Sequence, residues 1–282
     1  MELTAAEIRR AVRAALAEDL GSGDATTLAT VPVNAKSVAL MRAREPLIAA
    51  GIQFAEIAFH ELSPQIKIEK LARDGQKVVA GKPLLKISGS SRAILSAERV
   101  ALNFIQRLSG VATATALFAN EIKGYRAKIL DTRKTTPGWR RFEKYAVKCG
   151  GGKNHRIGLF DMILIKDNHL VALRHEKPNA VAAAILRARK KFPKLKVEVE
   201  ADTLAQVAQA VDAGADIILL DNMTTAQLRQ AVKIIRGRAK TEASGGVNLK
   251  TVRAIAATGV DFISVGAISH SAPAVDIGLD FE

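Results

Sequence analysis

Short aliphatic runs and helical stretches alternate along the second half of the chain. The spacing of apolar residues predicts helices over 180–191, 203–213, 224–236 and 248–258, with Asn248 as the N-cap of the last. Six aliphatic runs accompany them, with the sequences KIL, MILI, KVEVE, DIILL, KTEAS and DFISV. The later runs end 21 to 34 residues apart, which is the length of a strand and a return helix, at Lys166, Glu200, Asp221, Ser244 and Gly266. This pattern predicts parallel strands, and six runs with room for a seventh favour a closed α/β barrel over an open sheet.

The first third of the chain has a different pattern. Thr4 and Glu7 form a capping box for a helix that ends at Gly21. We expect strands over 36–44 and 65–69 and helices over 46–62 and 91–108, with the helical pattern resuming at 112–122. These elements predict an α+β domain at 1–108 and a barrel domain at 109–269, with the tail 270–282 packed back on the first domain.

Composition restricts the class of protein. The 282 residues are 48% hydrophobic and 25% charged, and no apolar run approaches the roughly 20 residues of a membrane span. The first residues lack the apolar core of an export signal, so we expect a soluble protein of the cytoplasm that does not bind membranes. Cys149 is the single cysteine, which excludes an internal disulfide. The neighbouring Lys148 and Lys153 would favour a thiolate at Cys149, but no chemistry inferred from this sequence requires that nucleophile.

Positive charge is concentrated in one segment. The net charge is +14, and a count over residues 121–175 gives 13 lysines and arginines against 5 acidic residues. These charges interleave with glycines and aliphatic runs at predicted strand ends, so we expect a cavity for a polyanion in place of a solvated basic face. Aromatic residues make up 4% of the chain and no nucleic-acid-binding motif is recognised. Small anionic substrates therefore explain the charge better than nucleic acid does.

Acidic residues occupy two of the predicted strand ends. Glu198 and Glu200 alternate along KVEVE, so both face the interior of the predicted barrel. Interior carboxylates are costly without a partner, which here would be Lys166, the basic pair 133–134 or a divalent cation. Asp221 ends the next strand at the same rim. Glu200 and Asp221 together suit a Mg²⁺ ion held largely through substrate and water.

Small residues follow the last two predicted strands. Ser244, Gly245 and Gly246 end or follow KTEAS, and Gly266 follows DFISV. Such residues let backbone N–H groups approach a phosphate, which is the usual phosphate position of α/β barrels. A tight turn explains either glycine site alone, but it explains less well why both occur after adjacent late strands.

Several segments resemble one known family. DTRKTTPG at 131–138, EKYAVKCGGGKNHR at 143–156 and LIKDNH at 164–169 resemble the signature of the quinolinate phosphoribosyltransferases. The likeness continues in order along the chain through ALAEDLGSGD, VEVE, ILLDN, EASGG and ISVGA. The resemblance implies an incomplete, about seven-stranded α/β barrel with an N-terminal α+β open-sandwich domain. It also implies a pentosyltransferase of de novo NAD biosynthesis, which joins 5-phosphoribosyl-1-pyrophosphate (PRPP) to quinolinate and releases CO₂ and pyrophosphate.

The resemblance also assigns roles to the matching positions. The pocket for the two carboxylates of quinolinate comprises Arg133, His155, Arg156 and Lys166. The pyrophosphate, metal and ribose hydroxyls of PRPP fall to Lys134, Glu200 and Asp221, and its 5′-phosphate falls to Ser244, Gly245, Gly246 and Gly266. Thr132 and Ser264 complete the substrate-binding set, and the catalytic set is Lys134, Lys166, Glu200 and Asp221. Glu200 and Asp221 would hold Mg²⁺, and whether His155 donates a proton or only a hydrogen bond stays open.

A homodimer is a further implication of the resemblance. The arginine of the matching ERVALN segment, Arg99, would enter the active site of the partner subunit, and dimers could assemble further. By its own sequence context, beside Glu98 in a helix, Arg99 reads as an ordinary exposed ion pair. Trp139 and Arg141 depart from the family pattern. Packing is the favoured role of Trp139 over that of a lid, and Arg141 would add charge near the site.

Two rival functions remain open at this point. A Schiff-base aldolase, or a paralogue acting on another heterocyclic acid, would use the same type of barrel, and Lys166 is the plausible Schiff-base lysine. A protein that binds nucleic acid without catalysis would use the positive charge instead.

Overall fold

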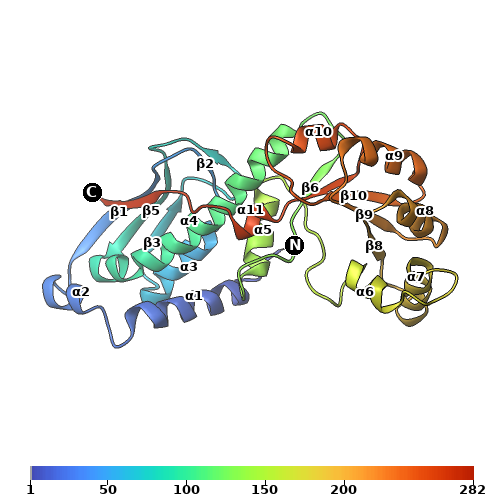
Figure 1. The fold of residues 1–282 in the computed structure, drawn as a ribbon. Coiled ribbons are helices and arrows are strands. Elements are labelled where there is room, and N and C mark those ends of the chain that lie inside the picture. Colours follow the sequence, from blue (N-terminus) through green and yellow to red (C-terminus); the bar gives the residue numbers. More distant parts are fainter. Residues whose placement is uncertain (1) are drawn as a thin grey trace. The chain divides into compact units, whose positions relative to one another are not determined.

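The computed structural model describes residues 2–282 and divides into two compact units (Figure 1). The first unit contains the chain up to residue 116 together with 137–151 and 271–282, and the second contains 117–136 and 152–270. The expected domains were 1–108 and 109–269. The compact units differ from them chiefly because 137–151 belongs to the first unit.

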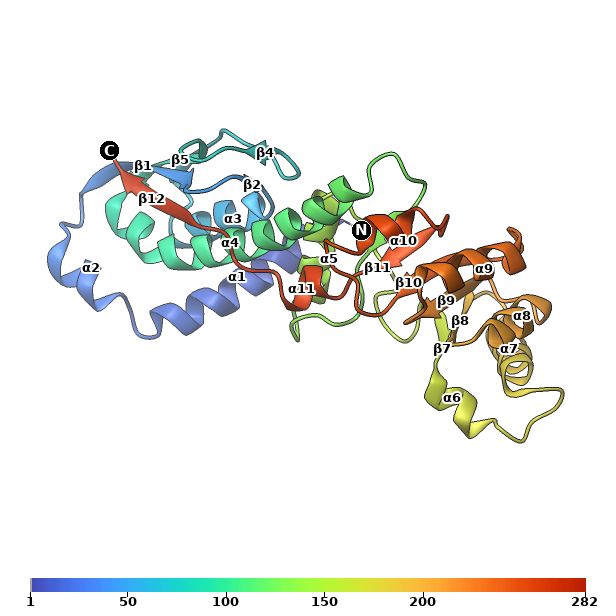
Figure 2. The same ribbon diagram turned by 45° about the horizontal axis from the view of Figure 1, so that its top comes forward.

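A four-stranded antiparallel sheet forms the centre of the first unit. Its strand order is β12 (Ile277–Phe281), β1 (Lys36–Ala43), β5 (Pro83–Ser90) and β3 (Lys67–Lys70). Helices α3 (Ile52–Leu62) and α4 (Ser91–Glu121) lie against this sheet in both views (Figures 1 and 2). The last strand, from the tail of the chain, pairs with β1 from Ala39 to Ala43. A second, two-stranded sheet pairs β2 (Leu47–Ile48) with β4 (Lys77–Val78).

The remaining helices of the first unit follow local sequence signals. Helix α1 (Ala5–Leu20) starts with the expected capping box of Thr4 and Glu7 and buries Ile8, Val12 and Leu16. The short α2 (Ala25–Thr30) is capped by Asp24, whose carboxylate accepts a hydrogen bond from the backbone of Thr27. Helix α5 (Arg140–Cys149) follows the turn at 137–139.

The expected helix over 46–62 was wrong at its start. Residues 47 and 48 form strand β2, and the helix begins only at Ile52, after Gly51 with φ of +94°. Asp74 accepts hydrogen bonds at 3.1 Å from the backbone N–H groups of both Gly51 and Ile52. The start of the helix is therefore fixed by a carboxylate more than twenty residues away, which local periodicity does not reveal.

Aromatic packing explains Trp139. Its ring stacks on Phe104 with centroids 4.9 Å apart and meets Phe142 edge-on at 6.0 Å. Phe104 also stacks on Phe54 at 5.0 Å. Trp139 thus belongs to an aromatic core, which is the role favoured from the sequence. Arg141 pairs with Glu7 at 2.5 Å, so its charge is offset within the same unit.

Six parallel strands form the sheet of the second unit, in the order β6-β11-β10-β9-β8-β7. All six aliphatic runs became strands, as predicted. Their bounds are Lys128–Leu130 (β6), Ile163–Ile165 (β7), Val197–Ala201 (β8), Ile217–Asp221 (β9), Lys240–Ser244 (β10) and Phe262–Ser264 (β11). The connecting helices are α6 (Asp167–Ala172), α7 (Ala180–Lys191), α8 (Leu204–Asp212), α9 (Thr225–Ile235), α10 (Val252–Ala256) and α11 (Ala267–His270).

The strand order describes a barrel interrupted at one place. The first strand of the unit pairs with the last, and β6 and β7 are the edges. A single parallel bridge between Leu130 and Lys153 extends the β6 edge. These pairings do not close the sheet, so the closed barrel favoured by the aliphatic runs alone is not formed by them. The α/β class and the parallel sheet are confirmed.

Register determines which side chains share a face of this sheet. Glu200 pairs with Leu219, which pairs with Glu242, and in-register neighbours of a parallel sheet point to the same side. Glu198, two residues before Glu200, lies on that face too. Figures 1 and 2 show α7, α8 and α9 side by side along the sheet, and Val197 and Val199 of β8 are fully buried on the alternate face. Three glutamates therefore project from the inner face.

The start of α10 differs from that of the predicted helix 248–258. The regular part of α10 begins at Val252, but Asn248 caps the turn that precedes it: its side chain accepts from the backbone N–H groups of Lys250 and Thr251, and its carbonyl accepts from that of Val252. None of the helices within residues 2–282 has both the length and the hydropathy that a membrane span requires.

Candidate active site

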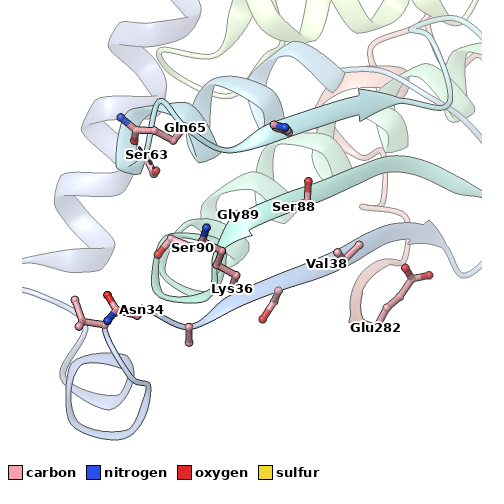
Figure 3. A pocket seen from close by; sticks show the side chains of 13 residues that line it. Asn34, Lys36, Val38, Ser63, Gln65, Ser88, Gly89, Ser90 and Glu282 are labelled. Atoms are coloured by element: carbon pink, nitrogen blue, oxygen red, sulfur yellow. Dashed lines mark hydrogen bonds between the residues drawn. The ribbon is translucent and has the colours of Figure 1, made fainter.

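One cavity of the first unit lacks a catalytic group of side chains. It has a volume of about 1000 Å³ and lies along β1, β5 and the start of β3 (Figure 3). Its charged lining residues are Lys36, Lys67 and Glu282, and serines and backbone make up much of the rest. Neither histidine nor cysteine lines it. The predicted site residues of the chain lie elsewhere.

A cavity of about 390 Å³ lies at the carboxyl ends of the strands of the second unit. Its lining includes eight of the residues predicted from the sequence: Thr132, Lys134, Asp221, Ser244, Gly245, Gly246, Ser264 and Gly266. Asn222 and His270 also line it and were not predicted. These residues come together because the carboxyl ends of parallel strands lie at the same edge of the sheet.

Gly245 and Gly246 give this cavity a wall of backbone. Both have left-handed φ angles, of +92° and +59°. At Gly245 a Cβ atom would lie 2.1 Å from the Asn222 Oδ1 atom and 2.9 Å from its backbone nitrogen. Asn222 itself has φ of +52°, and its N–H donates to the carbonyl of Ser244 at 3.0 Å. Glycine is therefore required at 245 by both conformation and space.

We expect Gly245→Ala to raise the KM for PRPP by about tenfold or more, because Asn222 must move and the left-handed backbone is strained. Gly214→Ala is the matched control, since Gly214 has φ of +78° but no atom within 4 Å of its added Cβ. The control reproduces the strain and leaves the cavity intact. Steady-state kinetics of both variants check the effect, and an equal KM change in both would contradict a cavity-specific role of Gly245.

The side chains of Lys134 and His270 both lie next to Gly266. A Cβ atom at Gly266 would lie 3.1 Å from His270 Nε2 and 3.3 Å from Lys134 Cδ. The Lys134 backbone is held at both of its polar groups, because its N–H donates to Thr132 Oγ1 at 3.0 Å and its carbonyl accepts from Ser269 Oγ at 2.9 Å. A side chain at 266 would press on the lysine stem, so glycine leaves room for the cation at the cavity.

Asp131 anchors the segment that carries His155. Its buried carboxylate accepts from Asn154 Nδ2 at 2.7 Å and from the backbone N–H of His155 at 2.8 Å. Lys153 pairs by backbone with β6 at the same place. The end of β6 thereby fixes the position of residues 153–156, although they lie more than twenty residues further along the chain.

Two guanidinium groups lie close together on this side of the sheet. Arg156 is 9% exposed, and its side chain donates to the carbonyl of Met162 at 3.0 Å. Burial lowers the pKa of Arg156, and the charge of Arg133 lowers it further, whereas Glu198 opposes the shift. Like charges held at this range indicate a site that an anion would stabilise.

Lys166 and Glu200 form an ion pair at 3.4 Å, and Lys166 was one of the three partners that the sequence left open for the interior glutamates. Burial raises the pKa of Glu200, Lys166 opposes this rise, and Asp221 adds to it. An ammonium group that is half exposed and paired with a carboxylate is not the desolvated neutral amine of a Schiff-base enzyme. The aldolase alternative therefore gains no support from the surroundings of Lys166.

Three acidic side chains gather at the rim. Carboxylate oxygens of Glu200, Asp202 and Asp221 all lie within 4.8 Å of one another. Few hard oxygen donors at an accessible rim fit a Mg²⁺ ion that keeps waters and binds mainly through phosphates. Asp202 was missed by sequence reasoning, although it follows Glu200 at the alternating position and could have been found from that spacing.

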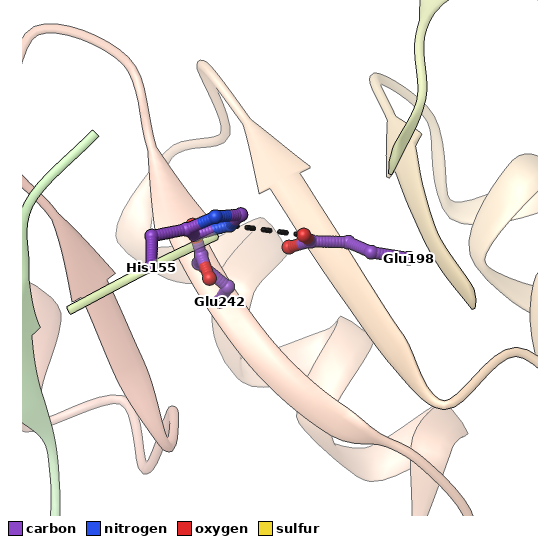
Figure 4. A group of neighbouring side chains, drawn as sticks. All are labelled: His155, Glu198 and Glu242. Carbon is purple, nitrogen blue, oxygen red and sulfur yellow. Dashed lines mark ion pairs between the residues drawn. The ribbon is translucent and has the colours of Figure 1, made fainter. Parts of the chain in front are cut away.

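A buried group of His155, Glu198 and Glu242 lies on the inner face (Figure 4). His155 Nε2 is 3.0 Å from Glu198 Oε2 and 3.5 Å from Glu242 Oε1. Burial raises the pKa of both carboxyls, and for Glu242 the neighbouring Glu198 adds to the rise. The sequence predicted a partner for Glu198 among Lys166, the pair 133–134 or a metal, and the observed contact is His155 instead.

Two other sequence-derived candidates lie in the first unit. Burial raises the pKa of the Cys149 thiol to about 12, so this cysteine is not an activated nucleophile. Arg99 is exposed on helix α4.

Comparison with known proteins identifies the family. Residues 24–109 match the N-terminal domain of quinolinate phosphoribosyl transferase, and residues 111–280 match its C-terminal domain. The chain belongs to the quinolinate phosphoribosyltransferase family. The resemblance inferred from the sequence motifs is thereby confirmed.

Individual members of the quinolinate phosphoribosyltransferase family match almost end to end. The chloroplastic nicotinate-nucleotide pyrophosphorylase (carboxylating) of Arabidopsis thaliana is 42% identical, over 98% of this chain and 83% of that protein. The corresponding protein of Mycobacterium leprae is 42% identical, over 96% of each chain. The solved nicotinate-nucleotide pyrophosphorylase of Francisella tularensis is 43% identical with a TM-score of 0.93, and the match covers 100% of this chain and 98% of that one.

Proposed function

We propose that this chain transfers the phosphoribosyl group of PRPP to quinolinate and releases CO₂, forming nicotinate mononucleotide and pyrophosphate for NAD biosynthesis. Family membership supports the reaction. The observation that carries it in this molecule is the convergence of Lys134, Asp221 and the backbone of 244–246 on one cavity at the carboxyl ends of the strands. Cations, acids and glycine amides at one rim suit a substrate with a phosphate, a diphosphate and a diol.

The donor, PRPP, would occupy the cavity of about 390 Å³. Its 5′-phosphate would bind the backbone at 244–246 and at Gly266. Gly245 and Gly246 are both left-handed, and backbone of this kind can turn its N–H groups toward an anion. Lys134 would contact the diphosphate, and Glu200 and Asp221 would face the ribose hydroxyls or the metal. Thr132 and Ser264 line the same wall.

The acceptor, quinolinate, would bind beside the donor on the inner face. Arg133 and Arg156 supply planar forks that match carboxylates, and Lys166 adds a point charge. Burial lowers the pKa of Arg156 and the charge of Arg133 lowers it further, so a bound carboxylate would offset part of the repulsion between the two side chains.

The chemistry requires little covalent help. The C1–O bond of PRPP breaks with oxocarbenium character, and its electron pair leaves on pyrophosphate. The lone pair of the pyridine nitrogen forms the new bond to C1, while the carboxylate clamps hold the ring in line. The positive ring then accepts the electron pair of the breaking C2–carboxylate bond, CO₂ departs, and C2 takes a proton from water.

Mg²⁺ is the proposed cofactor. Glu200, Asp202 and Asp221 fit it as oxygen donors, and when bound it would neutralise charge on the diphosphate. Lys134, which lines the same cavity as Asp221, would contribute to the same task. We also propose that the enzyme acts in the cytoplasm. Because some relatives are named as chloroplastic, cell fractionation is the test of this location.

A direct assay tests the function. Purified protein is mixed with Mg²⁺, PRPP and quinolinate labelled with ¹⁴C in the 2-carboxylate, and labelled CO₂ and nicotinate mononucleotide are measured together. Equal amounts of both products are expected, with loss of turnover in EDTA and recovery on adding Mg²⁺. Failure to form either product under these conditions would reject the proposal.

Arg99 supports a further part of the proposal, a homodimer with shared active sites. The side chain is exposed on α4, where a partner subunit could use it. We expect Arg99→Ala to lower kcat/KM by about 10²-fold, the cost of removing one partner of a buried charge contact.

Mixing subunits distinguishes a shared site from a local role of Arg99. Arg99→Ala and Lys134→Ala protein are each expected to be nearly inactive, whereas mixed dimers carry one intact site. Random exchange should restore activity at about a quarter of all sites. Co-purification of differently tagged subunits confirms that mixed dimers form, and mixed dimers without restored activity would show that Arg99 does not act across the interface.

A further inference from the structure

The buried group of His155, Glu198 and Glu242 contains polar atoms that the proposed reaction does not use. Glu198 on β8 and Glu242 on β10 both lie on the inner face of the sheet, and they are 0% and 1% exposed. Figure 4 shows the ring of His155 pointing toward the carboxyl group of Glu198, with Glu242 next to the ring. Among the described residues, no hydrogen bond of good geometry reaches either oxygen of Glu198 or the Oε2 atom of Glu242, although His155 Nε2 lies 3.0 Å from Glu198 Oε2. Such buried groups require an explanation.

Hydrogen-bond direction fixes the protonation of the ring. The backbone N–H of Arg156 donates to His155 Nδ1 at 2.7 Å. A ring nitrogen that accepts a hydrogen bond carries no proton, and an imidazolium has protons on both nitrogens. His155 in this geometry is therefore the neutral tautomer with its proton on Nε2. That N–H faces Glu198 Oε2 at 3.0 Å and Glu242 Oε1 at 3.5 Å.

The same contact excludes a metal centre at this place. One potential ligand atom of each of the three side chains lies within 4.8 Å of the others, which by itself would allow one. A neutral histidine that binds a metal through Nε2 must carry its proton on Nδ1, and usually donates it to a carboxylate or a carbonyl. Here Nδ1 faces the N–H of Arg156, so two donors would point at each other. Arg156 also brings a positive charge close to Glu198.

Glu242 is held from its other side. Ser264 Oγ donates to Glu242 Oε1, which is the Glu242 oxygen that contacts His155 Nε2. Ser264 sits on β11, the neighbouring strand, and lines the proposed PRPP cavity. The contacts thus run from that cavity through Glu242 to His155, and from His155 to the backbone of Arg156 in the proposed quinolinate pocket.

We infer that Glu242 is a positioning residue: with Glu198 it holds His155 as the Nε2–H tautomer, which fixes the backbone of Arg156 and leaves His155 unable to serve as a proton donor to the substrate. This inference rests on the proposed function, because it concerns the quinolinate pocket of that reaction. It excludes the first of the two roles that the sequence left open for His155, that of a proton donor. The proton that replaces CO₂ at C2 then comes from a source other than His155.

Glutamine is the informative replacement for Glu242. Its carbonyl oxygen can accept from Ser264 and from His155 Nε2, and its amide can donate to the oxygens of Glu198 that no hydrogen bond of good geometry reaches. Alanine removes the acceptor and leaves buried donors unpaired. Glu242→Ala should therefore raise the KM for quinolinate by about tenfold, with the KM for PRPP changed by less than about twofold, and Glu242→Gln should behave like the wild type.

Thr241→Val provides a matched control on the same strand. Thr241 is also buried, but it lies on the opposite face of β10 and bonds to Asp261 instead. Its loss lowers stability without touching His155. A rise in the KM for quinolinate in this control equal to that in Glu242→Ala would reduce the role of Glu242 to general stability and overturn the inference.

The tautomer is tested directly by ¹⁵N NMR of histidine-labelled protein without substrate, with the His155 signals assigned from His155→Asn. Nε2–H correlations with an unprotonated Nδ1 are expected in the wild type and in Glu242→Gln, and a weakened tautomer preference is expected in Glu242→Ala. An imidazolium, or a proton on Nδ1, at neutral pH in the wild type would overturn the inference. The wild-type measurement needs no variant to fold.

The two proposals fail separately. Wild-type protein that forms no nicotinate mononucleotide rejects the proposed function, whatever the ring tautomer. Active wild-type protein with equal effects of Glu242→Ala on both KM values, or with no effect, rejects the positioning role and leaves the function intact.

Discussion

Replacing Arg133 with alanine is expected to lower kcat/KM for quinolinate by about 10³-fold while the protein remains folded. Arg133 is close enough to Arg156 for its charge to lower the pKa of that buried guanidinium. A bidentate contact with one carboxylate of the substrate is worth about 2 to 5 kcal/mol when its loss leaves the partner charge unpaired. The substrate would then bind to a pocket with one guanidinium group, where the wild-type pocket has two.

The Arg133 experiment separates geometry from charge. Arg133→Lys keeps the positive charge but not the planar fork, so it should recover only a small part of the loss. Arg187→Ala, which removes an exposed arginine paired with Glu176, controls for the reduction of net charge. Kinetics with both substrates varied, and circular dichroism to check folding, provide the measurement. Turnover within threefold of wild type in Arg133→Ala would remove the assignment of the dicarboxylate pocket.

Strands with alternating or continuous apolar runs were the most predictable part of the fold. A parallel sheet is covered on both faces, so its strands appear in the sequence as nearly continuous apolar runs. On the outer face, Val197, Val199, Ile218 and Leu220 are all fully buried. Position at a strand end then predicted convergence at one rim, and the cavity lined by Lys134, Asp221 and 244–246 has that location. Local pattern was sufficient because strand direction and register follow from it.

Contacts between distant segments were the least predictable part. Asp74 sets the start of α3, and Asp131 holds the segment that carries His155, in both cases by accepting backbone N–H groups far along the chain. Nothing in the local sequence of an aspartate indicates which N–H group it will reach. The same limit applies to closure of the sheet, which depends on whether β6 and β7 meet and not on the pattern of either strand.

Glu242 shows where a stricter use of the pattern would have helped. Ser244 was predicted at the rim, and period-two alternation places Glu242 on the same inner face, one layer deeper. The sequence argument considered only Glu198 and Glu200 as interior acids, because KVEVE displays the alternation openly. A third interior carboxylate changes the chemistry, since it supplies His155 with a second acceptor and makes a basic partner for Glu198 unnecessary.

Lys134→Ala is expected to lower kcat by about 10³-fold with little change in the KM for quinolinate, because the lost charge acts on the departing diphosphate and not on the acceptor. The backbone of Lys134 is held by Thr132 and Ser269, so the side chain can be removed without releasing the loop. Its stem lies over Gly266, however, and packing could contribute to any loss.

Lys134→Met keeps most of that stem and removes only the charge, so it is the matched control for Lys134→Ala. If the ammonium group stabilises the leaving diphosphate, both variants lose kcat to about the same extent. A methionine variant that retains most of the wild-type kcat would instead show that Lys134 acts by filling space beside Gly266 and His270. Because pyrophosphate departs before or with attack by the ring nitrogen, single-turnover measurements of pyrophosphate release place the defect at that step, whereas a defect confined to CO₂ release would contradict the assigned role.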